Sequence, residues 1–191
     1  MSVQEVDKST RPLTIQPKKV TLSRIIIGQL IGVGIIIIAG WNIWPQILSW
    51  LATNELRPQL PDVLKFKALP IYVLVHMGAA ITALSLGAVV LFSPKGNATH
   101  KMMGRVWVVA MVTTAVSSFF MESFAPMLGQ FGPIHLLAVW TLMNMPRAIL
   151  MARKGNIDGH LQVMKATYWG LVIAGVMTFI PGRVMFSMFF Q

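Results

Sequence analysis

Four histidines are the residues of this sequence that are best suited to bind a cofactor. His100 follows His76 by 24 residues, and His160 follows His135 by 25. Two imidazoles on facing helices supply the two axial nitrogens of a six-coordinate haem iron, and imidazole is also a ligand for zinc and copper. The absence of cysteine excludes thiolate metal sites and haem attachment through a Cys-x-x-Cys-His sequence. Any cofactor is therefore held without a covalent bond.

The segments that must position these histidines are strongly apolar. Of the 191 residues, 55% are hydrophobic and 12% are charged, which is too few charges to coat a water-soluble globule. Five segments have the length and composition to cross the hydrocarbon core of a bilayer. The sequence therefore predicts an all-α, polytopic membrane protein of about five transmembrane helices with a four-helix bundle core. The five segments are residues 25–51, 70–92, 106–121, 134–152 and 166–190.

The distribution of basic residues predicts how the chain is oriented. Five Lys and Arg residues precede the first apolar segment, and such residues accumulate on the cytoplasmic side of a membrane. We expect a bacterial inner-membrane protein with its N-terminus in the cytoplasm and its C-terminus in the periplasm. The first apolar segment is too long for a signal-peptide core, so we expect it to be retained. The expected parts are a flexible cytoplasmic tail (1–20), a first transmembrane helix (21–52), a periplasmic loop (53–69) and a four-helix transmembrane domain (70–190).

The four-helix domain consists of two similar predicted hairpins. The first descends from His76, turns through SPKGNAT and returns from His100, and the second descends from His135, turns through RKGNIDG and returns from His160. Both turns contain Lys-Gly-Asn. This layout places His76 and His135 near the periplasmic side and His100 and His160 near the cytoplasmic side. At the helical rise of 1.5 Å per residue, the two layers are roughly 20 to 27 Å apart.

Each layer therefore offers one pair of imidazoles, which is the ligand set of one bis-His haem b. A flat macrocycle also requires small residues beside its ligands, so that the helices can approach its faces. Arg147 and Arg183 are the charged residues closest to apolar surroundings, and each is a candidate either to pair with haem propionates or to snorkel to the interface. The small residues near the histidines are Gly78, Ala79, Ala80, Gly87, Gly104, Gly132, Gly159, Gly170 and Gly175.

Other interpretations of the same residues stay open. A histidine near a membrane interface is often only a snorkelling polar residue, and small residues are common wherever transmembrane helices pack. Zinc or copper could bind to His76 with His135 and to His100 with His160, whereas the separation of the layers argues against one four-histidine site. The net charge of +10 is spread over helix ends, which argues against nucleic-acid binding and favours contact with anionic lipid headgroups.

Residues 70 to 186 carry a resemblance to a known family. The stretches HMGAAITALSLGAVVLFSPKGNATHKMMGRVWV, WTL, RKGNIDGHLQVMKATYWG and PGR are similar to a bacterial family of predicted membrane proteins, catalogued as domain of unknown function 2306. The layout of four histidines on four consecutive helices is more distantly similar to the cytochrome b561 family. That likeness implies one haem between the first and third histidines and another between the second and fourth. By position, these pairs are His76 with His135 and His100 with His160.

Together, these observations lead to one functional expectation and two alternatives. We expect a membrane-embedded, b-type dihaem electron-transfer protein that moves electrons across the inner membrane, as a possible transmembrane oxidoreductase. Its expected partners are the lipid bilayer and either quinol or a periplasmic redox partner. The alternatives are a non-catalytic accessory or assembly subunit of a larger membrane complex and a metal-handling membrane protein that uses His and Met.

Overall fold

A computed structural model describes residues 22–55, 57–61, 63–123, 126, 128–181 and 183–190. Over these residues the chain forms helices and connecting segments, and no β-strand occurs among them. The predicted all-α class is therefore confirmed for the described part of the chain. The tail predicted for residues 1–20 lies outside the described residues.

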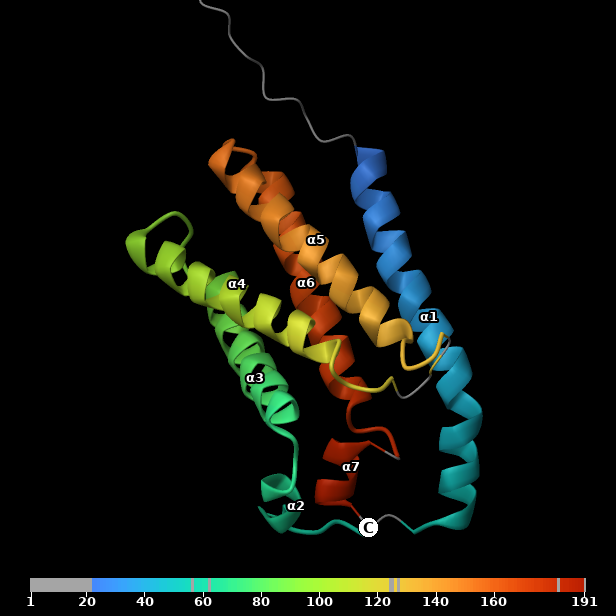
Figure 1. The fold of residues 1–191 in the computed structure, drawn as a ribbon. Helices are drawn as coiled ribbons and strands as arrows, with labels where there is room; N and C mark the ends of the chain where they lie inside the picture. Colours follow the sequence, from blue (N-terminus) through green and yellow to red (C-terminus); the bar gives the residue numbers. More distant parts are fainter. Residues whose placement is uncertain are drawn as a thin grey trace, which may run out of the picture.

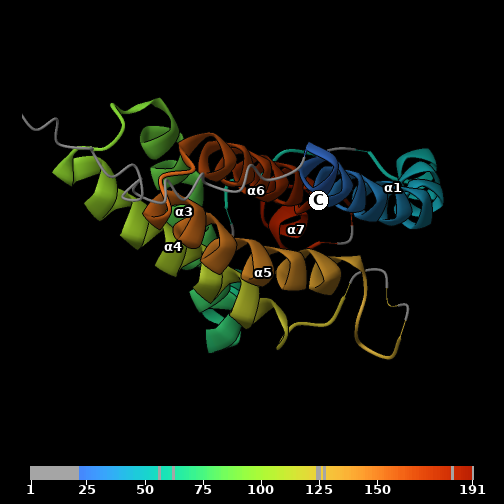
Figure 2. The ribbon, with the colours of Figure 1, turned by 90° about the horizontal axis from the view of Figure 1, so that it is seen from above.

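Four helices form the core of the structure, and we call them the core helices. They are α3 (Ile71–Phe92), α4 (Ala98–Ser118), α5 (Pro133–Arg153) and α6 (Ile157–Met177). Helix α3 packs against α4 and α6, and α5 packs against α4 and α6 (Figures 1 and 2). Within the described residues, α3 and α5 are long and apolar enough to cross a membrane. Each core helix also exposes large apolar side chains, such as Ile81, Val109, Met143 and Val176, which are 63 to 69% accessible.

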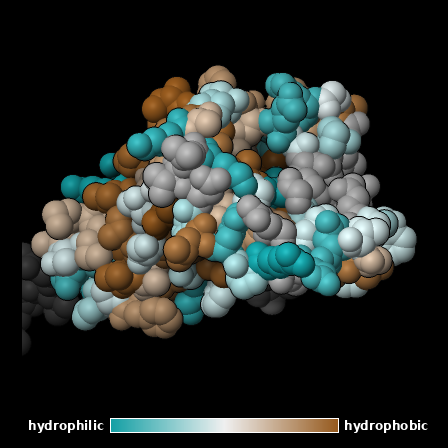
Figure 3. All heavy atoms as spheres, turned by 90° about the horizontal axis from the view of Figure 1, so that it is seen from below, coloured by the Kyte–Doolittle hydropathy of each residue, from teal (hydrophilic) through white to brown (hydrophobic). Residues whose placement is uncertain are grey.

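The remaining helices extend this core. Helix α1 (Leu22–Thr53) is the longest and packs along α5, with further contacts to α6 (Figure 1). The segment that follows α1 contains the short helix α2 (Val63–Lys67). We call the end of the core near α2 the cap end, and the end that holds the α3–α4 and α5–α6 connections the turn end. Figure 3 looks at the cap end, where polar and apolar side chains lie side by side.

The apolar segment predicted over residues 166–190 is not one helix, which corrects the expectation. Helix α6 ends at Met177, and the short helix α7 (Val184–Phe189) follows after a turn. Pro181 lies in this turn and has no N–H to donate to a preceding helical carbonyl, so a continuous helix is disfavoured there. Helix α7 instead packs at the cap end, where the main-chain N–H of Gln59 donates to Phe189 O at 2.8 Å.

The two connections at the turn end have the same backbone design. Gly96 and Gly155 adopt positive φ angles of 85° and 73°, a region that a residue without a side chain enters at little cost. The next residue caps the following helix in both cases. Asn97 Oδ1 accepts from the N–H of His100 at 2.7 Å, and Asn156 Oδ1 accepts from the N–H of Gly159 at 3.0 Å. The repeated Lys-Gly-Asn therefore marks two equivalent helix starts.

This design makes a testable prediction for the first turn. We expect Asn97→Ala to lower the free energy of unfolding by about 1 kcal/mol, because one of the first N–H groups of α4 loses its acceptor. Thermal unfolding in detergent, followed by circular dichroism, measures this loss. Asn97→Ser is the matched control, since a serine hydroxyl also caps helices. Equal destabilisation by both variants would show that the cap contributes nothing.

Trp107 of α4 is one of the largest fully buried side chains of the core, at 2% exposed. Its indole Nε1–H donates to the main-chain carbonyl of Ala83 at 2.8 Å, and it lies over Gly87 of α3. The ring of Tyr168 on α6 also lies against Gly87. This contact therefore joins α3, α4 and α6. The buried residues of the same cluster are Ala83, Trp107, Ala110, Met111, Met145, Ala148, Met151, Val163 and Met164.

Candidate functional site

His160 lies in the first turn of α6, at the turn end, and is partly buried. Its Nδ1 lies 3.0 Å from the main-chain carbonyl oxygen of Ala148 on α5. Because a carbonyl can only accept, Nδ1 must carry the proton and donate it. The neutral ring therefore keeps its lone pair on Nε2. This is the tautomer that histidine ligands adopt, with the second nitrogen held by an outer hydrogen bond.

His100 lies in the first turn of α4, at the same end of the core. Its Nδ1 is 3.4 Å from Ser93 Oγ, which follows the last residue of α3. A Coulombic interaction links the His100 ring to His160 and to Lys95. The structure therefore brings His100 and His160, which belong to different hairpins, within electrostatic reach of each other.

Lys95 places a positive charge within electrostatic range of His100. Its Nζ donates to the carbonyls of Val90 and Ser93 at 3.1 and 3.0 Å and also to that of Leu91. Lys95 thus satisfies carbonyls at the end of α3 that have no partner within the helix, a favourable place for a cation. The ammonium group is held at the turn end, where an anionic group of a ligand would meet it.

His76 lies at the cap end, in the second turn of α3. Its Nδ1 is 3.0 Å from Ser117 Oγ on α4, and the Ser117 hydroxyl donates to the carbonyl of Thr113 at 2.7 Å. Because that proton is in use, the imidazole Nδ1 donates to Ser117. The carbonyl of Thr114 is a further acceptor near the ring. Nε2 therefore carries the lone pair, and no hydrogen bond to it is found in the described residues.

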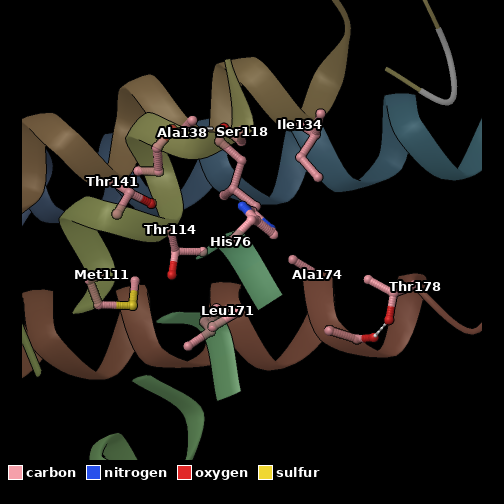
Figure 4. A pocket seen from close by; sticks show the side chains of 14 residues that line it. His76, Met111, Thr114, Ser118, Ile134, Ala138, Thr141, Leu171, Ala174 and Thr178 are labelled. Atoms are coloured by element: carbon pink, nitrogen blue, oxygen red, sulfur yellow. Dashed lines mark hydrogen bonds between the residues drawn. The ribbon is translucent and has the colours of Figure 1, made fainter. Parts of the chain in front are cut away.

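A pocket of about 100 Å³ opens beside His76, between all four core helices (Figure 4). It is lined by the cap-end turns of these helices, and its walls are mainly apolar. The polar groups on its wall are His76 and hydroxyl side chains, and no charged residue lines it. The hydroxyl-bearing residues are Thr114, Ser118, Thr141 and Thr178.

His135 is arranged differently from the other three histidines. It is buried in the first turn of α5, and its Nδ1 accepts from the N–H of Gly132 at 3.2 Å. Nδ1 is therefore unprotonated in the neutral ring, and Nε2 carries the proton. Phe119 and Phe131 lie beside the ring, with centroids 5.7 and 4.9 Å away, and Nε2 is buried without a hydrogen-bond partner among the described residues. His135 thus serves as a helix cap and is not among the residues that line the His76 pocket.

The predicted pairs therefore differ in their geometry. His100 and His160 interact at the turn end, whereas His76 faces the pocket and His135 faces two phenylalanine rings. In the part of the chain that the structure describes, no group of three His, Asp or Glu side chains is placed to hold a metal ion.

The two candidate arginines lie at opposite ends. Arg147 is partly buried on α5, next to Ala148, whose carbonyl accepts from His160. Arg183 begins α7 at the cap end, and burial lowers the pKa of its guanidinium from the ordinary value. The glycines also divide into two classes. A Cβ on Gly87 would collide with Trp107 and Tyr168, whereas a Cβ on Gly78, Gly104 or Gly175 would meet nothing within 4 Å.

The sequence interpretation missed the hydroxyl residues of the pocket. Thr114, Ser117 and Ser118 follow one another at helical spacing within an otherwise apolar part of α4, and Thr141 faces them from α5. Such a polar stripe in an apolar segment is the signal that could have identified the pocket.

Comparison with known proteins identifies the family. A family model described as "Predicted membrane protein (DUF2306)" matches residues 73–191, which is more than half of the chain and includes all four histidines. No curated protein and no solved structure matches the chain. The chain belongs to the DUF2306 family of predicted membrane proteins.

Proposed function

We propose that this protein carries electrons in the bacterial inner membrane by means of a haem b held between His100 and His160. The observation that carries the proposal is that His100 and His160 lie in the first turns of α4 and α6, both at the turn end and within range of a Coulombic interaction, although they come from different hairpins. The Nδ1–H bond from His160 to Ala148 O supports it further, because it leaves Nε2 for an axial bond. When bound, a bis-His haem supplies one-electron chemistry.

Two other residues at the turn end are suited to contact the edge of a haem. Lys95 lies within electrostatic range of His100 and can neutralise a carboxylate there. Gly104 follows His100 by one helical turn, and the space beside it is open. Both features favour a flat, anionic macrocycle at this end of the core.

The geometry around His76 and His135 at the cap end fits a haem less well than that around His100 and His160. The pocket beside His76 holds about 100 Å³, whereas sites for ligands of drug size or larger occupy roughly 300 Å³ or more. In addition, His135 uses Nδ1 as an acceptor, so Nε2 is protonated and has no lone pair for iron. We therefore propose one haem per chain in place of the two that the histidine spacing predicts.

The proposal includes the arrangement in the membrane. Helices α1, α3, α4, α5 and α6 would make five passes, with the N-terminus and the turn end on the cytoplasmic side. Successive core helices run in opposite directions, which supports this path (Figure 1). Lys95, Lys101 and Arg105 at the turn end agree with an excess of basic residues in the cytoplasm.

An optical spectrum tests the proposed function. We expect the protein, purified in detergent from haem-replete cells, to show sharp b-type bands when dithionite-reduced and oxidised spectra are subtracted. Pyridine haemochrome analysis should give one haem per chain. Two haems per chain would support the cap-end pair as well. A colourless protein that stays colourless after haem addition would contradict the proposal and favour an accessory subunit.

A further inference from the structure

We propose that the pocket beside His76 binds the reduced head group of a membrane quinone, a neutral quinol. The inference goes beyond the proposed function, because it concerns the binding of the quinol and not its oxidation. The binding itself depends on the pocket alone.

The size and walls of the pocket select a small, neutral ring. A cavity of about 150 Å³ with apolar walls holds a benzene molecule in another protein. This pocket of about 100 Å³ is smaller but partly open, so it can hold one side of a small ring whose remainder extends beyond the opening. No charged side chain lines it, so an ion would lose its hydration without compensation. Its position at the cap end of apolar helices is one that a lipid-soluble molecule can reach.

The polar groups of the pocket then select a molecule with hydroxyl donors. Thr114, Ser118 and Thr178 already donate to the carbonyls of Ala110, Ala115 and Gly175, at 2.9, 2.8 and 2.6 Å. These three hydroxyls can therefore only accept from a ligand. His76 Nε2 adds a stronger acceptor, because its lone pair is fixed by the bond from Nδ1 to Ser117.

Thr141 is the exception among the hydroxyls of the pocket. It is 6% exposed, it lines the pocket, and its hydroxyl has no hydrogen-bond partner in the described part of the chain. Figure 4 shows its oxygen beside the pocket. This oxygen is not among the fully buried polar atoms that lack a partner, so it is accessible from the pocket and can form a hydrogen bond with a ligand oxygen there.

A quinol matches this set of groups. One hydroxyl can donate to His76 Nε2, and an oxygen of the ring can accept from Thr141. The oxidised quinone has carbonyls in place of hydroxyls, so its oxygen would face the lone pair of Nε2. The pocket should therefore prefer the reduced form, and His76 should be the residue that discriminates.

The test is equilibrium binding of decyl-benzoquinol and decyl-benzoquinone to the full chain in detergent, measured by titration calorimetry on protein with and without haem. We expect the quinol to bind about tenfold more tightly than the quinone, which corresponds to one hydrogen bond to a buried group. His76→Leu should abolish this preference. Thr141→Val should weaken both forms about equally, by threefold to tenfold. Thr167→Val, at a buried threonine of α6 that bonds to Val163 outside the pocket, is the matched control and should change neither.

Each outcome is informative. Equal binding of the two forms by the wild type, or weakening by Thr167→Val as large as that by Thr141→Val, would overturn the inference. Because Thr141→Val preserves side-chain volume, it keeps the test valid if His76→Leu does not fold. Because binding depends on the pocket alone, a preference for quinol in protein without haem supports the inference whatever the spectrum of the purified protein shows. A haem protein without this preference would contradict the inference and leave the proposed function standing.

Discussion

Replacing His160 with alanine abolishes the b-type spectrum, and replacing His100 does the same, if the two rings share one haem. Each substitution removes one axial nitrogen, and the low-spin, six-coordinate state requires both. The reduced-minus-oxidised spectrum of each purified variant measures the loss, which we expect to exceed tenfold relative to wild type.

The control for this experiment is His135→Gln. Glutamine at the third position of a helix can reach back to the N–H of the residue that starts it, so this variant keeps the cap on Gly132 and removes the imidazole. We expect an unchanged spectrum. A lost or halved spectrum in His135→Gln would restore the cap-end pair as a haem site and contradict the assignment to the turn end.

Replacing Gly87 with alanine should have the largest effect on stability. An added Cβ would lie 2.5 Å from Trp107 Nε1 and 2.5 Å from Tyr168 Cδ2, closer than real contacts allow. Since the Trp107 ring is also tied to Ala83 O, it cannot move without losing a buried hydrogen bond. We expect a loss of about 1–3 kcal/mol, which thermal unfolding in detergent would show as a lower Tm.

Gly78→Ala is the matched control on the same helix. A Cβ there meets nothing within 4 Å, and alanine favours the helical backbone over glycine by roughly 0.5–1 kcal/mol. We expect an unchanged or slightly higher Tm. If the two variants have the same Tm, the contact of Gly87 with Trp107 and Tyr168 does not limit stability.

Much of the fold could be predicted because its determinants are local. Apolar length predicted the positions of α1, α3 and α5, and the two segments with Lys-Gly-Asn were correctly predicted as turns. The positive φ of the glycine and the asparagine cap are features that the structure adds. The end of α6 was missed because hydropathy does not register that Pro181 lacks an N–H.

The site was harder to predict, because it depends on which ring nitrogen of each histidine carries the proton. His76 and His135 have the same predicted depth, yet one donates from Nδ1 and the other accepts at Nδ1. Sequence spacing carries no information on tautomers. Gly87 was likewise expected to let a macrocycle approach the helix. In the structure the indole of Trp107 lies against it, a long-range contact that one sequence does not reveal.

The polar contacts within each hairpin bear on how the chain is made. Among the core helices, the described side-chain hydrogen bonds between helices join α3 to α4, through His76 and Trp107, or α5 to α6, through His160. If the hairpins insert into the membrane as proposed, each can enter the lipid with these groups already paired. Across the seam between the hairpins the described core helices form no side-chain hydrogen bond with each other, so side-chain packing, including that around the hydroxyls of the pocket, joins the two hairpins.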